Sequence, residues 1–66
     1  MEDTERLRIV LKRLIEEMGY YEQEYGDWTD LAKNAGLDAA AGLIQDAQES
    51  IRSGNLALKA ALDSIG

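Results

Sequence analysis

The feature that most constrains this chain is the spacing of its apolar residues, which recur at alternating intervals of three and four. In the first half these residues are Leu7, Leu11, Leu14, Met18, Tyr21, Tyr25, Trp28, Ala32 and Ala35. In the second half the same positions hold Leu37, Ala40, Ile44, Ala47, Ile51, Gly54, Leu58, Ala61 and Ile65. A seven-residue repeat is typical of long amphipathic helices that pack on one another, whereas strands alternate every two residues. The pattern therefore predicts an all-α fold.

The two patterns fall out of register between Ala35 and Leu37. Gly36 suits the left-handed conformation that ends many helices, and Lys33 would place a cation in the last turn. Asp38 can cap the helix that follows. We therefore expect a single domain over residues 1–66, an antiparallel hairpin of two helices at about 3–35 and 38–65. Its register would bring Met18 near Gly54 and Trp28 near Ile44.

Glycines inside the predicted helices leave an alternative open. Gly19 and Gly26 each cost roughly 1 kcal/mol relative to alanine in a helix interior. A loop over 19–27 would give three helices, at about 4–18, 27–35 and 38–65. We favour the hairpin because the seven-residue pattern passes through both glycines without losing phase, which a loop has no reason to preserve.

The size of the chain favours association with another chain. It has 66 residues and no Cys, His or Pro, so no disulfide and no thiolate or imidazole metal site can support its small core. Val10, Ile15, Leu31, Leu43, Ala57 and Leu62 also widen the apolar stripe. We therefore expect a homodimer that forms a four-helix bundle. The expected core and interface residues are Leu7, Leu11, Leu14, Met18, Tyr21, Tyr25, Trp28, Ile44, Ile51, Leu58 and Leu62.

The charge balance excludes several classes of partner. The formal net charge is −6, and an acidic surface repels nucleic acids and anionic membranes. The longest apolar stretch, Ala39–Ile44, is far shorter than the roughly 20 residues of a membrane span. The acidic start Met1-Glu2-Asp3 lacks the basic segment of a signal peptide. We expect neither a nucleic-acid nor a membrane partner, and a cytoplasmic location.

The residues offer little catalytic chemistry. Ser50, Ser53 and Ser64 have no His or Cys partner in the sequence, and nucleophilic catalysis needs an activating base. We expect no enzyme activity, no catalytic residues, no cofactor and no dedicated metal site. A bundle that binds metal through carboxylates, Glu17 among them, is the alternative that the acidic residues leave open.

Six acids and no base lie between Leu14 and Ala32. Solvated helix faces explain such a run most simply. The sharper interpretation is that Tyr20, Glu22 and Glu24 are exposed and contact an unidentified protein partner. An acidic inhibitor or nucleic-acid mimic, bound in a basic groove of another protein, is therefore an alternative function.

Several segments resemble a known family. They are Leu7-Arg8-Ile9-Val10-Leu11, Leu14-Ile15-Glu16, the aromatic pair Tyr25 and Trp28, and the ending Leu56–Gly66. Together they resemble small uncharacterised helical-hairpin domains of bacteria and archaea. The histidines of that family, at four-residue steps along the first helix, would fall on Arg13, Glu17 and Tyr21. The resemblance thus implies the scaffold without the metal-binding histidine face, and it implies no activity.

Overall fold

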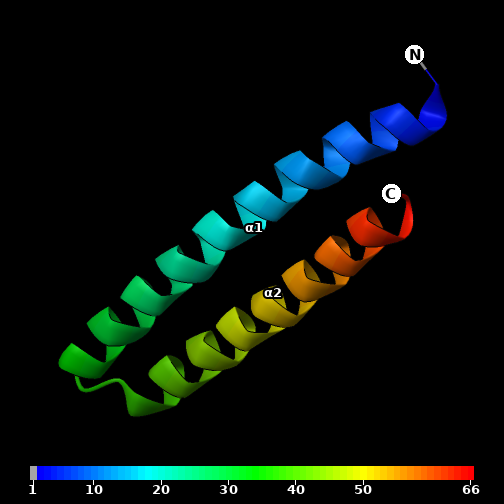
Figure 1. The fold of residues 1–66 in the computed structure, drawn as a ribbon. Helices are drawn as coiled ribbons and strands as arrows, with labels where there is room; N and C mark the ends of the chain where they lie inside the picture. Colours follow the sequence, from blue (N-terminus) through cyan, green and yellow to red (C-terminus); the bar gives the residue numbers. More distant parts are fainter. Residues whose placement is uncertain (1) are drawn as a thin grey trace.

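The computed structural model describes residues 2–66, which form two helices and no strand (Figure 1). Helix α1 (Asp3–Asn34) and helix α2 (Asp38–Ser64) run antiparallel along one another, with both chain ends at the same end of the hairpin. The predicted all-α hairpin is confirmed, and each helix ends one residue earlier than expected. Met1, the first residue of the predicted domain, lies outside the described residues.

The alternative with three helices is wrong, because α1 continues unbroken through residues 19–27. The cost of each interior glycine is outweighed by packing along the partner helix, which supplies most of the stability of helices in proteins. Gly54 even assists this packing, since a Cβ atom there would lie 3.3 Å from Cε of Met18. This contact also confirms the expected register of Met18 beside Gly54.

The turn between the helices has the geometry of a Schellman motif. Gly36 has a φ of 76°, a left-handed conformation that glycine adopts without steric cost. The N–H of Leu37 donates to the carbonyl of Ala32 at 2.9 Å, and the N–H of Gly36 donates to that of Lys33 at 3.0 Å. These bonds satisfy carbonyl groups that the end of α1 would otherwise leave unpaired.

The start of α2 corrects one prediction. Asp38 was expected to cap the helix, but it is the first helical residue, and Leu37 is the N-cap, with no side-chain cap hydrogen bond. The Schellman motif accounts for this shift, because it already places Leu37 directly at the helix entrance. The Asp38 carboxylate still lies in the first turn, where a negative charge suits the helix dipole.

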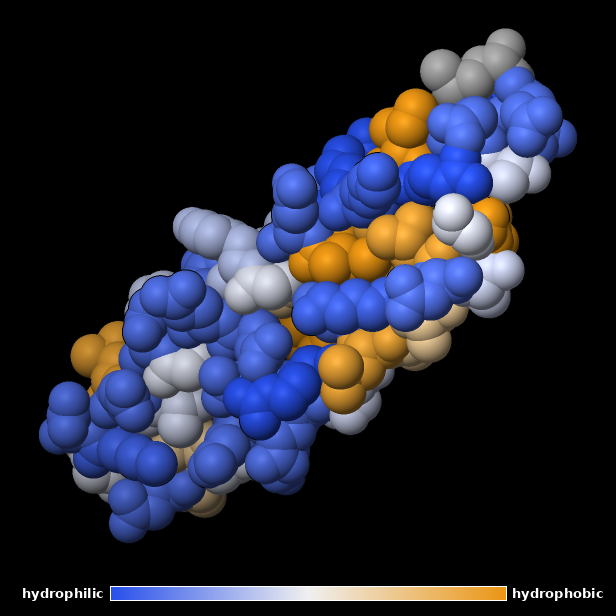
Figure 2. Space-filling view, viewed as in Figure 1, coloured by the Kyte–Doolittle hydropathy of each residue, from blue (hydrophilic) through white to orange (hydrophobic). Residues whose placement is uncertain are grey.

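The hairpin is a single layer that measures 51 × 15 × 11 Å. Two helices in contact can cover only one stripe of each other, so the layer has two broad faces that no other element covers. Among the described residues, the buried apolar side chains are only Leu11, Ala32 and Ala41. The face seen in Figure 2 is hydrophilic over most of the end near the turn, and hydrophobic residues show mainly toward the free end.

Candidate interaction face

Polar side chains share the buried seam between the helices with those three apolar residues. Thr29 is 5% exposed, and its Oγ1 donates to the carbonyl of Tyr25 at 3.0 Å. This bond to residue i−4 satisfies a hydroxyl inside a helix. Asn55 is equally buried, yet its Oδ1 has no hydrogen-bond partner. The seam is therefore narrow and partly polar.

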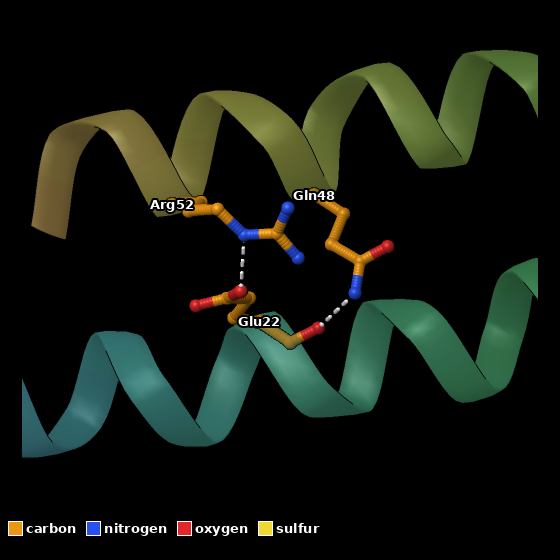
Figure 3. Close-up of polar contacts among 3 residues, drawn as sticks. All are labelled: Glu22, Gln48 and Arg52. Carbon is orange, nitrogen blue, oxygen red and sulfur yellow. Dashed lines mark hydrogen bonds and ion pairs between the residues drawn. The ribbon is translucent and has the colours of Figure 1, made fainter.

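Three polar residues connect the helices near their middle (Figure 3). Nε of Arg52 donates to Oε1 of Glu22 at 2.6 Å, and Nε2 of Gln48 donates to the main-chain carbonyl of Glu22 at 2.9 Å. The hydrogen bond and the charge of Glu22 raise the pKa of Arg52, which favours its charged form. We call these three residues the polar clamp.

The free end has its own connection. Nη2 of Arg8 donates to the carbonyl of Ile65 at 3.2 Å, and the same guanidinium pairs with the Glu5 carboxylate. Arg8 thus ties the last turn of α2 to α1. With the polar clamp, it fixes the relative rotation of the helices and so decides which side chains remain uncovered.

An open apolar groove lies where the helices approach the turn. It has a volume of about 510 Å³, and both helices and the turn contribute to it. Its lining residues are Trp28, Leu31, Ala32, Ala35, Leu37, Ala40 and Ile44. Trp28 is 51% exposed here, which leaves a large hydrophobic ring half in contact with water.

The groove belongs to a longer apolar surface. Trp28 and Ala35 continue along α1 as a row that repeats every seven residues, and Ala40 continues in the same way along α2. Residues seven apart lie on nearly the same side of a helix, so both rows open on the side of the groove. We call this surface the apolar face; it comprises Val10, Leu14, Tyr21, Trp28, Leu31, Ala35, Leu37, Ala40, Leu43, Ala47, Gly54, Ala57 and Ala61.

The predicted core residues divide between the seam and the apolar face. Leu11 is buried, and Leu7, Tyr21 and Trp28 are exposed. The others are half-buried: Leu14, Met18, Tyr25, Ile44, Ile51, Leu58 and Leu62. Of the residues expected to widen the stripe, Ile15 and Leu62 turn toward the seam, while Val10, Leu31, Leu43 and Ala57 are exposed.

The predicted contact residues Tyr20, Glu22 and Glu24 do not form one exposed cluster. Tyr20 is exposed, with its ring edge-to-face against Tyr21 at a centroid distance of 6.0 Å. Tyr20 and Glu24 line a small hollow together with Gln23 and Asp27. Glu22 departs from the expectation, because it is half-buried and its carboxylate is bound by Arg52 within the hairpin.

Sequence reasoning missed Gln48 and Arg52 as residues that connect the helices, and Thr29 and Asn55 as buried residues of the seam. The sequence did contain a signal for Gln48 and Asn55. Together with Ala41 and Leu62 they form a row at seven-residue intervals beside the predicted stripe. Nothing in the spacing distinguishes a polar residue at the edge of a seam from one on an outer surface.

Metal binding and membrane insertion receive no support from the described residues. Within 2–66, no three acidic side chains lie close enough together to hold a metal ion. Neither α1 nor α2 contains an apolar segment long enough to cross a membrane. The apolar face is therefore the most prominent candidate for a functional surface in this part of the chain.

Comparison with known proteins identifies a family and no individual relative. Neither the curated proteins nor the solved structures include a match to this chain. A family model described as "Domain of unknown function" matches residues 22–65, which include the polar clamp, the turn and all of α2. The first-helix segment that begins the resemblance noted above, Leu7–Glu16, lies before the match. The chain belongs to this family, DUF8180.

Proposed function

We propose that this protein self-associates into a homodimer, a four-helix bundle, and acts through protein–protein interaction. The observation that carries the proposal is the apolar face, which remains open along both helices of the hairpin. Exposed apolar patches of this extent on soluble proteins mark interaction sites. A cytoplasmic location is part of the same proposal, and fractionation of cells that express the tagged chain tests it.

The dimensions of the face suit a second copy of the chain. It lies on a broad side of the hairpin, which measures 51 by 15 Å. The area of that side is close to the ~800 Å² that each partner buries in a standard stable interface. A two-fold dimer needs a surface that complements itself. Stacking two such layers would bury both apolar faces in one core, as in known four-helix bundles.

Energetics support the same conclusion. A chain of about 60 residues buries only roughly 60% of its unfolded surface, so its stability as a monomer is marginal. This hairpin buries very few apolar side chains fully and has no disulfide, because it contains no cysteine. Burial of the apolar face in a dimer would supply the missing hydrophobic free energy.

Two leucines of α2 provide a matched test. Leu43 is 70% exposed and lies three residues after Ala40, on the apolar face; Leu56 is 60% exposed and lies two residues after Gly54, on the opposite side. Leu43→Glu should lower the light-scattering mass from twice 7.3 kDa to 7.3 kDa, and Leu56→Glu should leave the dimer intact. Equal effects of the two substitutions, or a monomeric parent chain, would overturn the proposal.

A second candidate function rests on a different observation, the acids near the turn. Glu24, Asp27, Asp30, Asp46 and Glu49 make no ion pair among the described residues, so their charges are available to a basic groove on another protein. An acidic inhibitor or nucleic-acid mimic would lose its partner in high salt. A captured partner that stays bound at high salt, and after Glu24→Lys with Asp27→Lys, would exclude this candidate.

A further inference from the structure

Most of the net charge of the hairpin lies in one half. The ion pair between Glu22 and Arg52 marks the middle and is itself neutral, so the turn half comprises residues 23–51 and the free half comprises residues 2–21 and 53–66. The turn half contains six acids and one base, and the free half contains six acids and five bases. The turn half thus carries a net charge of −5, while the free half carries only −1.

Because of this asymmetry, the two ways of stacking hairpins face to face differ in electrostatic repulsion. With turn over turn, two halves of charge −5 would lie one layer apart, and packed helices are separated by about 8–10 Å. That spacing is close to the Debye length of ~8 Å at physiological ionic strength, so salt only partly screens the repulsion. With turn over free end, each acidic half faces a half with a net charge of only −1.

The apolar side chains favour the same arrangement. The groove near the turn is open. At the other end of α1, the side chains of Leu7 and Val10 are exposed. On α1, Leu14 and Trp28 lie seven residues on either side of Tyr21. If the two-fold axis passes Tyr21, then Leu14 meets the partner's Trp28, and Val10 meets the partner's Ala32 in the groove.

We infer that two copies stack with the turn half of one over the free half of the other, with α1 against α1, α2 against α2, and the two-fold axis near Tyr21 and Ile51. The groove near each turn is then filled by the free end of the partner. On α2 the facing residues are small, because Ala40, Ala47, Gly54 and Ala61 form the row. Small residues permit close approach of the two α2 helices. This inference rests on the proposed homodimer.

Spin labels measure the orientation directly, since the chain has no cysteine to interfere. Asn34→Cys labels the turn end and Gln23→Cys labels the middle; both positions are exposed and outside the apolar face. Asn34 lies thirteen residues from Tyr21, so at 1.5 Å per residue the two Asn34 labels would be offset along the bundle by about 39 Å. The two Gln23 labels would be offset by only about 6 Å.

The expected result is a distance between Asn34 labels clearly longer than that between Gln23 labels, in a sample whose mass is that of a dimer. Equal distances for the two sites in a dimeric sample would overturn the orientation and leave the homodimer standing. A monomeric mass with no dipolar coupling at either site would overturn the homodimer itself. The same pair of variants thus separates the two failures.

Discussion

Asn55 places a neutral amide in the seam between α1 and α2, where its Oδ1 lacks a hydrogen-bond donor. An unsatisfied buried polar group costs about 1–3 kcal/mol. In coiled coils, a single buried Asn is known to fix the register of the helices at such a cost. Asn55 is therefore a position where the hairpin gives up stability.

Replacement of this amide should stabilise the protein. Asn55→Ala removes the unsatisfied group and raises helix propensity, so the free energy of unfolding should increase by about 1 kcal/mol or more. Thermal or urea unfolding at a fixed protein concentration measures the change. The control is Asn34→Ala at the exposed end of α1, which changes propensity alone. A loss of stability in Asn55→Ala would mean that the amide is hydrogen-bonded in the assembled protein.

At the scale of the helices, Gly19 and Gly26 form a natural comparison within α1. A Cβ atom at Gly19 would meet no atom within 4 Å, whereas one at Gly26 would lie 2.8 Å from Nε2 of Gln48. Gly19→Ala should therefore stabilise the protein by about 1 kcal/mol through helix propensity. Gly26→Ala should gain less, because it displaces Gln48 from the Glu22 carbonyl. Equal gains in urea unfolding would show that the Gln48 bond contributes nothing.

Gly36 should respond in the opposite direction. Its φ of 76° places it in the left-handed region, which costs L-residues roughly 1–2 kcal/mol. Gly36→Ala should lower the free energy of unfolding by about that amount, although Ala is the better helix former. Gly42→Ala is the control inside α2, where a Cβ atom meets nothing within 4 Å, and it should stabilise. A gain in Gly36→Ala would contradict the observed turn.

The elements that local chemistry specifies were predictable from the sequence. Gly36 marks the turn, and the spacing of three and four gives the helices and the register of Met18 beside Gly54. The rotation of each helix about its own axis was not predictable. It depends on long-range contacts such as Glu22 with Arg52 and Arg8 with the Ile65 carbonyl, and no local pattern distinguishes these polar residues from solvated ones.

The rotation of each helix about its own axis decides which apolar residues the other helix covers. The sequence therefore predicts only part of the candidate site. A broad apolar stripe indicates that some surface beyond the seam must be covered, and this expectation agrees with an exposed Trp28. The spacing does not say which members of the stripe lie in the seam. Leu11 and Trp28 stand in the two alternate rows of the repeat, and only the structure shows that Leu11 is buried while Trp28 is exposed.

At the scale of the whole molecule, charge opposes assembly while the apolar face favours it. Each copy carries a net charge of −6, so two copies repel each other at a distance. Raising NaCl from about 0.01 to 0.15 M shortens the Debye length from ~30 to ~8 Å. The dissociation constant of the dimer, measured by sedimentation, should therefore decrease over this range. An increase with salt would indicate that ion pairs between the copies hold the dimer together.

The proposed four-helix bundle forms only if a second copy covers the apolar face. Absolute mass by light scattering behind a sizing column, across a dilution series of the unmodified chain, tests this most directly. The predicted result is a mass of twice 7.3 kDa that persists at micromolar concentration. A mass of 7.3 kDa at every concentration would contradict the account, since the hairpin would then be stable with its apolar face open to water.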